Sequence, residues 1–185
     1  MRKRLLLLLL FALFLPQTHY CWAQFIVSPD GIKTEDGKDF LVITADNMSK
    51  QELYQAVLKH TTKTYVSPKD VISNVEGEVI TINGLFTIND VVDYNVNYTL
   101  RMEFRDGRMK YSVPHINYMK GYFQGKEYEL TYNVSNGGFG SVCLVGIYNK
   151  KGELKRKKAK SQLERFFNDG VSSLKQALIT KEEDW

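Results

Sequence analysis

Residues 96–113 read VNYTLRMEFRDGRMKYSV, and polar and apolar side chains alternate along them. The even-numbered residues from 96 to 104 are apolar, and those between them are polar. Such alternation is typical of a strand with one buried and one solvated face. Asp106-Gly107 then provides two residues that tolerate the positive φ of a tight turn, and the alternation resumes at Met109. We therefore predict a β-hairpin.

A two-residue turn also fixes how the two strands pair. The pairs predicted on the apolar face are Phe104 with Met109, Met102 with Tyr111, Leu100 with Val113 and Tyr98 with His115. On the polar face, Glu103 lies opposite Lys110 and Arg105 opposite Arg108. Turn chemistry, alternation and cross-strand pairing agree, so the prediction is consistent at every level.

The segment before the hairpin predicts an amphipathic helix from Ser49 to Thr64. Ser49 and Glu52 have the spacing of a capping box, in which each side chain satisfies a free amide of the first turn. One arc of the helix can pack on the sheet and contains Leu53, Tyr54, Val57, Leu58, Thr61 and Tyr65. Residues 40–44 predict a short strand that leads into this helix.

Further strands are predicted on both sides of the hairpin. Residues 71–75 and 79–88 form a pair around Glu76-Gly77, with a bulge or bend at Gly84. Residues 117–149 are aromatic and rich in turn signals, and 141–148 can form one more strand. A second amphipathic helix follows residue 160 and keeps its apolar phase through Gly170, where glycine allows close approach to the sheet.

The first 23 residues read as a secretory signal peptide. Basic residues 2–4 precede an apolar run from Leu5 to Leu15, and Cys-Trp-Ala at 21–23 precedes the expected cleavage site. A membrane anchor and lipidation of Cys21 are the alternatives. The apolar run is shorter than the roughly twenty residues of a spanning helix, and residues 18–20 lack the small side chains of a lipidation site. We therefore expect export to the periplasm or the extracellular space, with no transmembrane segment after cleavage.

Cleavage also changes the charge of the chain. It removes three of the 25 basic residues and none of the 21 acidic ones, which leaves a net charge of +1. The basicity of the whole chain is therefore mostly a targeting feature and not a sign of a polyanionic partner. Cys143 becomes the lone cysteine, so no intrachain disulfide can form, and its apolar neighbours predict a buried thiol.

Three stretches resemble a family of secreted bacterial domains of unknown function with a TBP-like fold, found mostly in Bacteroidetes. These stretches are QELYQA at 51–56, SPKDVI at 67–72 and YTLRMEFRDGRMKY at 98–111, with a weaker echo in FFND at 166–169 and SLK at 173–175. The resemblance implies an α+β fold in β-α-β-β-β-β-α order. A curved antiparallel sheet would carry an N-terminal and a C-terminal helix on one face and leave the other face free. The resemblance brings no catalytic residues and no cofactor.

These observations predict a domain organisation with one core. Residues 1–23 are the signal peptide, and 24–38 form an irregular N-terminal arm or a small hairpin. Residues 39–180 form the TBP-like domain, and 181–185 are a frayed tail. The mature chain is long enough for one substantial core.

The first functional hypothesis is a non-enzymatic binding or adaptor module of the bacterial envelope. Its candidate binding residues lie on the open sheet face and are Arg101, Arg105, Arg108 and Lys110. Arg105 and Arg108 face each other, which is unfavourable without a partner or solvent. An ordinary solvated sheet face is the alternative, because one-sided antiparallel sheets are common.

Two other ligand classes remain open. Exposed rings in the aromatic stretch 118–132 can stack on sugars, unless they are core residues. The basic run 150–160 can contact anionic lipid, lipopolysaccharide or another polyanion through Lys155, Arg156, Lys157 and Lys158, unless it is a solvated lead-in to the helix. The export signal argues against a nucleic-acid partner. An envelope protein or a glycan is the expected partner class.

An enzymatic function has the weakest support. His60 and His115 are the histidines that remain after cleavage, and neither has a metal-ligand spacing or a neighbouring carboxylate. Cys143 has no base near it in the sequence. The stretch NGGFG at 136–140 lacks the lysine and helix of a phosphate-binding loop. We therefore expect no catalytic residues, metal or cofactor.

Overall fold

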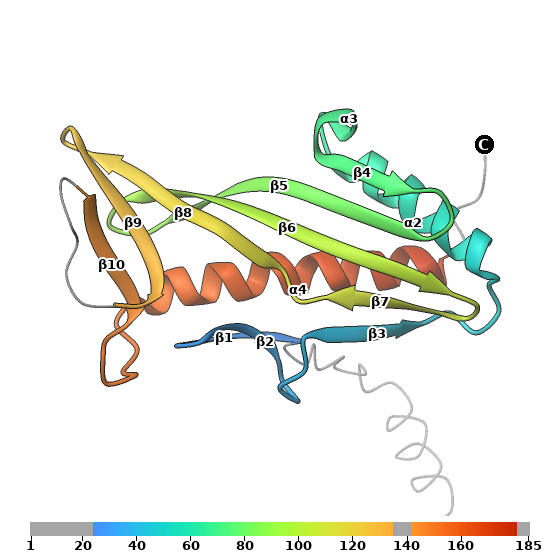
Figure 1. The fold of residues 1–185 in the computed structure, drawn as a ribbon, viewed down its shortest axis with the longest axis horizontal. Helices are drawn as coiled ribbons and strands as arrows, with labels where there is room; N and C mark the ends of the chain where they lie inside the picture. The colour runs from blue at the N-terminus through green and yellow to red at the C-terminus, as the bar shows by residue number, and fades with distance from the viewer. Residues whose placement is uncertain (1–23, 135–141, 181–185) are drawn as a thin grey trace, which may run out of the picture.

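The computed structural model describes residues 24–134 and 142–180. Figure 1 shows an elongated molecule in which long strands run beside one long helix, α4. The predicted signal peptide and C-terminal tail lie outside the described residues.

Within these residues, eight strands form one sheet around the long central strand β6. β5 pairs along one side of β6, while β8 pairs with the first half of its other side and β7 with the second half. β3 pairs only with β7, and the β9–β10 pair is parallel whereas the other pairs are antiparallel. The strands are β3 (Phe40–Thr44), β4 (Ile72–Val75), β5 (Val79–Asn89), β6 (Asp93–Arg105), β7 (Arg108–Ser112), β8 (His115–Phe123), β9 (Lys126–Asn133) and β10 (Val142–Tyr148).

The predicted hairpin is β6–β7, and its pairing is confirmed near the turn. Phe104 lies opposite Met109 and Met102 opposite Tyr111. The prediction for His115 is wrong, because this residue pairs with Thr99 on the solvated face. β7 ends at Ser112, and Pro114 cannot donate to a strand ladder, so the chain restarts as β8 with its register shifted by one residue. A shift of one residue moves a side chain to the opposite face of the sheet.

The helices are α2 (Lys50–Thr64), the single turn α3 (Pro68–Val71) and α4 (Lys157–Ile179). The capping box of α2 is confirmed, since the Glu52 amide donates to Ser49 Oγ at 3.3 Å and the Ser49 amide donates to Glu52 Oε2 at 2.8 Å. α4 is continuous through Gly170, as its apolar phase predicts.

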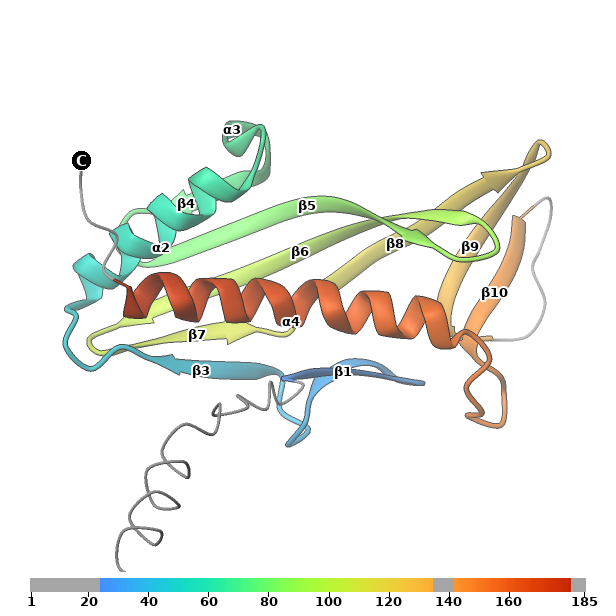
Figure 2. The same ribbon diagram turned by 180° about the vertical axis from the view of Figure 1, so that it is seen from behind.

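Both long helices cover the same face of the sheet, as expected. In Figure 2 α4 crosses in front of the strands, and in Figure 1 it lies behind them. The even-numbered residues of β6 are buried under the helices, and the Tyr54 ring of α2 packs edge-on against Phe104 at 5.4 Å between ring centres. The odd-numbered residues of β6 are exposed or half-buried. We call their side of the sheet the wet face.

Residues 24–38 form a hairpin rather than an irregular arm. Its strands are β1 (Phe25–Ser28) and β2 (Gly31–Thr34), and Phe25 and Val27 belong to the core. The Asn168 side chain of α4 accepts hydrogen bonds from the amides of Gln24 and Phe25 at 3.0 and 2.8 Å, and donates one to the Phe25 carbonyl at 3.0 Å. The hairpin is therefore fixed to the last helix.

The expected bulge at Gly84 is absent from the β5–β6 pair. This pairing runs without a shift from Val79–Glu103 to Asn89–Asp93. Gly84 lies opposite Tyr98, and a Cβ at position 84 would come within 2.3 Å of Tyr98 Cζ. Glycine is required here because the buried Tyr98 ring occupies the space that a side chain would need.

Candidate functional site

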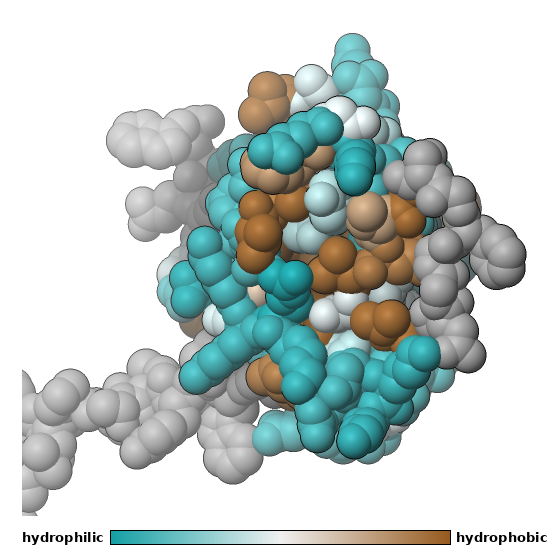
Figure 3. Space-filling view, turned by 90° about the vertical axis from the view of Figure 1, so that its left-hand side faces the viewer, coloured by the Kyte–Doolittle hydropathy of each residue, from teal (hydrophilic) through white to brown (hydrophobic). Residues whose placement is uncertain are grey.

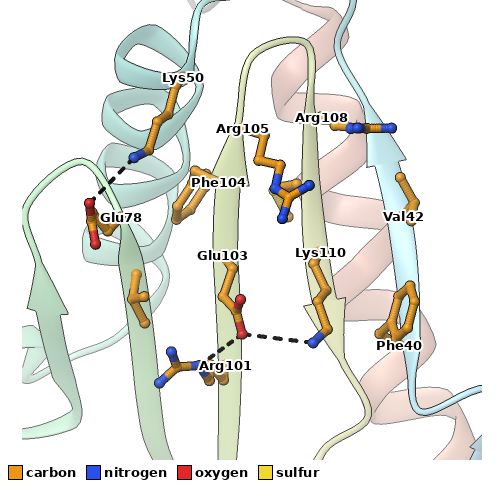
Figure 4. A pocket seen from close by; sticks show the side chains of 12 residues that line it. Phe40, Val42, Lys50, Glu78, Arg101, Glu103, Phe104, Arg105, Arg108 and Lys110 are labelled. Carbon is orange, nitrogen blue, oxygen red and sulfur yellow. Dashed lines mark hydrogen bonds and ion pairs between the residues drawn. The ribbon is translucent and has the colours of Figure 1, made fainter.

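The four candidate residues of the wet face meet in one hollow of about 510 Å³ near the β6–β7 turn. Arg101 and Arg105 come from β6, and Arg108 and Lys110 from β7. Figure 4 shows these side chains beside residues of β3, α2 and the start of β5. The hollow is also lined by Phe40, Val42, Lys50, Glu78, Val79, Glu103, Phe104 and Met109.

Glu103 is the shared anion of this hollow. Its Oε1 lies 3.0 Å from Arg101 Nε and 3.8 Å from Lys110 Nζ. The hydrogen bond from Arg101 lowers the pKa of Glu103 below its ordinary value, and the charges of Lys110, Arg101 and Arg105 lower it further. Two of the four candidate cations are thus partly neutralised within the protein.

Arg105 and Arg108 are not neutralised in this way. They are paired in register, both are exposed, and neither has an ion-pair partner among the described residues. With Lys50 and Glu78, which form an ion pair of 3.6 Å, the hollow has five basic and two acidic side chains and a net charge of +3. Asp106 at the turn accepts a hydrogen bond from the Lys50 amide. The arrangement can therefore hold an anionic group between the two arginines.

The wet face continues beyond the hollow as a row of amides and hydroxyls. Asn117 Nδ2 donates to Asn97 Oδ1 at 2.7 Å and to Thr99 Oγ1 at 3.2 Å. A register shift between Asn97 and Tyr98 places both Asn117 and Tyr118 opposite this row. Tyr118 is 39% exposed, and Tyr122, on the same face, is 69% exposed. Exposed rings next to amides can bind a sugar.

The aromatic stretch 118–132 is divided between surface and interior. Tyr118, Tyr122 and Phe123 are exposed, whereas Tyr128 and Tyr132 pack against the core. Burial raises the pKa of Tyr132 above its ordinary value. Part of the stretch therefore belongs to the core, which was the alternative to sugar binding for these rings.

The basic run before α4 is partly neutralised. Lys155 Nζ lies 2.9 Å from Glu153 Oε2, and Arg156 lies 3.6 Å from Asp90 of the β5–β6 turn. Lys157 and Lys158 are exposed in the first turn of α4. The run is distant from the hollow, because α4 begins at the β9–β10 end of the molecule (Figure 1).

Figure 3 looks at the β9–β10 end, where hydrophobic residues gather between hydrophilic ones. Val142, Cys143, Leu144 and Val145 of β10 are half-buried there. Cys143 is a free thiol, and it is less buried than its apolar neighbours predict, because β10 is the outermost strand at this end.

Residues 24–134 and 142–180 contain no group of three His, Cys, Asp or Glu side chains that could hold a metal ion. His60 Nε2 lies 3.5 Å from Ser173 Oγ at the junction of α2 and α4, and His115 is on the wet face. The expectation of a protein without catalytic residues or cofactor stays a prediction.

Sequence reasoning missed the part of the hollow that lies outside the hairpin. Phe40 and Val42 come from β3, Lys50 from the first turn of α2 and Glu78 from the β4–β5 turn. Their proximity depends on the β3–β7 pairing, which joins residues about seventy positions apart and leaves no local pattern. One signal was visible in the sequence: residues 40–43 are all apolar, so both faces of this strand carry apolar side chains. The structure nevertheless does not bury the strand on both sides.

Comparison with known proteins assigns the central part of the chain. Residues 40–119 match the model of a family described as a domain of unknown function (DUF4468) with TBP-like fold. This stretch is similar to that family. The DUF4468 segment runs from β3 into β8 and contains all four basic candidates of the hollow, so the resemblance and the fold class predicted from the sequence are confirmed.

Two solved structures are similar to the chain. One is a TBP-like protein from Parabacteroides distasonis, with 18% identity, coverage of 73% of this chain and 90% of that chain, and a TM-score of 0.49. The other is a DUF4468 family protein from Bacteroides ovatus, with 12% identity, coverage of 75% and 84%, and a TM-score of 0.46. No curated protein matches the chain. None of the helices in the described residues has the length and apolarity needed to cross a membrane.

Proposed function

We propose that this protein is an exported, non-enzymatic binding module whose wet face binds an anionic group of an envelope component. The observation that supports this most strongly is the facing pair of Arg105 and Arg108 without ion-pair partners in the described chain. Like charges opposite each other on a sheet are destabilising, and an anion placed between them removes that repulsion. Lys50, Arg101 and Lys110 add to the same field.

Binding of a heparin fragment by the mature chain tests this proposal, because its sulfate groups are a general anionic probe. The double charge reversal Arg105→Glu and Arg108→Glu is expected to lower affinity at least tenfold. The matched control is Lys157→Glu and Lys158→Glu, which changes the charge equally at the start of α4. An equal loss in both variants would mean non-specific attraction, and a loss in the control alone would transfer the site to the basic run.

Export is part of the proposal and has its own test. The basic residues 2–4, the apolar run and the Cys-Trp-Ala segment support it. The protein recovered from the periplasm or the medium of an expressing bacterium is expected to begin at Gln24. Recovery of a chain that starts at Met1 in the cytoplasm would refute export.

Glycan binding is a second candidate, supported by Tyr118, which lies opposite Asn97, and by the exposed Tyr122 further along the same face of β8. A glycan array probed with the mature chain is expected to show signals that Tyr122→Ala abolishes. Phe123→Ala is the control, because this neighbouring ring is also exposed but projects from the opposite face of β8. An array without signals would remove this candidate and leave the anion site in place.

A further inference from the structure

The strand β3 is an open edge of the sheet. Among residues 24–134 and 142–180 it pairs with β7 only, and the Val113 amide donates to the Asp39 carbonyl while the Ala45 amide donates to the Gly107 carbonyl, both at 2.8 Å. In an antiparallel ladder, bonded and non-bonded positions alternate. Phe40, Val42 and Thr44 therefore point three amides and three carbonyls away from β7. No hydrogen bond to these six groups is present in the described part of the chain.

This edge lacks the usual protection against strand pairing. Exposed edges are normally protected by a very short strand, by lysine or another charge, by proline, by a bulge or by a covering helix or loop. β3 reads FLVIT and has none of these features, and Val42 is 52% exposed. The edge strand β4 differs, since it reads ISNV and presents Ser73 and Asn74.

The open edge lies between two walls of different chemistry. On the wet face it borders the hollow, where Arg108 and Lys110 stand beside Val42, as Figure 4 shows. On the helix side it borders a groove of about 730 Å³ lined by Ile43, Leu178 and Ile179, of which Ile179 is 77% exposed. On the wet face an added strand would lie next to Phe40, Val42 and Thr44, with Arg108 and Lys110 one strand further away and within reach of long acidic side chains. On the helix side it would meet apolar side chains.

We propose that β3 accepts an extended segment of a partner protein as an additional strand, with acidic side chains on the wet face and apolar side chains on the helix side. Backbone hydrogen bonds to Phe40, Val42 and Thr44 hold the segment, and the alternation of its side chains provides selectivity. Charge complementarity with Arg108 and Lys110 favours this occupant over a basic or neutral strand. The inference shares these two residues with the proposed anion site but depends on the backbone of β3, so the two can fail separately.

Alternately N-methylated peptides test the inference without altering the protein. The probe is a nine-residue peptide that alternates Glu and Val, and its binding to the mature chain is measured by fluorescence polarisation. Methylation of the Glu amides blocks an antiparallel added strand, and methylation of the Val amides blocks a parallel one, because only one set of amides faces β3. One methylated peptide is expected to lose at least tenfold in affinity while the other binds normally. Equal binding of both would overturn the proposal, because charge alone would then explain the interaction.

The variant Thr44→Pro provides the complementary test. Proline at 44 removes an outward amide that β7 does not use, and proline is tolerated at such edge positions. We expect at least a threefold weaker peptide affinity with unchanged binding of the heparin fragment. Unchanged peptide binding by a variant that still binds heparin would contradict the inference. A concentration-dependent dimer in sedimentation that this variant abolishes would instead make a second copy of the chain the occupant.

Discussion

Single side chains determine the charge of the hollow, and Glu103 has the largest influence because Arg101 and Lys110 share it. As long as Glu103 is ionised, these two cations are less available to a ligand than Arg105 and Arg108. The residue therefore limits affinity at neutral pH. Its conversion to a neutral group should release both partners without disturbing the fold, since exposed ion pairs contribute only about 0–1 kcal/mol.

We predict that Glu103→Gln strengthens binding of the heparin fragment about fivefold, which corresponds to about 1 kcal/mol for one unit charge at close range in water. Wild-type affinity should also rise as the pH falls below the ordinary value of 4.5, because the pKa of Glu103 lies lower still. Affinity measured by calorimetry between pH 7 and pH 3 tests both effects. The variant should lack most of this rise, and a parallel rise in both proteins would assign the effect to other carboxylates.

The contribution of Glu103 to folding stability changes with pH in the opposite direction to the ligand affinity. A carboxylate with a lowered pKa stabilises the folded state above its ordinary pKa, and this contribution disappears as the pH falls through the lowered value. Wild type and Glu103→Gln should therefore differ in free energy of unfolding near pH 7 and converge in acid. Urea denaturation of both proteins at pH 7 and at pH 3 measures the difference in free energy of unfolding.

Gly84 shows how one residue fixes the packing of a strand pair. The Tyr98 ring cannot move aside, because its hydroxyl lies 2.8 Å from that of Tyr65 and its ring contacts Phe86 and Phe167. We predict that Gly84→Ala lowers the free energy of unfolding by about 1–3 kcal/mol through overpacking. The adjacent Leu85 is 60% exposed, so Leu85→Ala should cost much less. A Gly84→Ala protein as stable as wild type would show that the ring does not lie over β5.

At the scale of elements, local sequence patterns predicted those features that depend on residues close together in the sequence. The β6–β7 hairpin, the capping box of α2 and the continuity of α4 depend on alternation, S-x-x-E spacing and helical phase, all of which are visible within a few residues. The register of β8 was not predictable, because it depends on the interruption at Pro114 and the bulge at Asn117. The parallel β9–β10 pair was not predictable either, because alternation within one strand does not specify the direction of its neighbour.

The same distinction applies to the candidate site. Its four cations were predicted because they alternate along one hairpin, whereas Phe40, Val42, Lys50 and Glu78 reach the hollow through tertiary packing. Pairing between distant strands is specified by burial and geometry together, and neither can be read from a single strand.

The β1–β2 hairpin depends on α4 for its position. We predict that Asn168→Ala lowers the free energy of unfolding by about 1–3 kcal/mol, because it leaves the amide and carbonyl of Phe25 without partners in the interior. Amide hydrogen exchange should rise mainly in residues 25–34. Asn168→Asp keeps the acceptor and loses the donor, so it should be intermediate. Uniform loss of protection over the whole chain would mean that the hairpin is not a separate local unit.

At the scale of the molecule, one face of the sheet forms the core and the other is exposed to solvent. The helices and the β1–β2 hairpin bury one face and supply the core. No helix of the described residues covers the other face, which carries the basic hollow, the amide row and one wall of the β3 edge. The proposed anion site and the glycan candidate lie on this face, and the β3 edge joins it to the groove on the helix side.

Chemical-shift mapping of the isotope-labelled mature chain during titration with the heparin fragment tests this account most directly. We predict that the largest amide shifts occur in residues 101–110, extend to 40–44 and leave 155–158 unchanged. Shifts concentrated at 155–158, or on the outer surfaces of α2 and α4, would contradict the assignment of binding to the wet face.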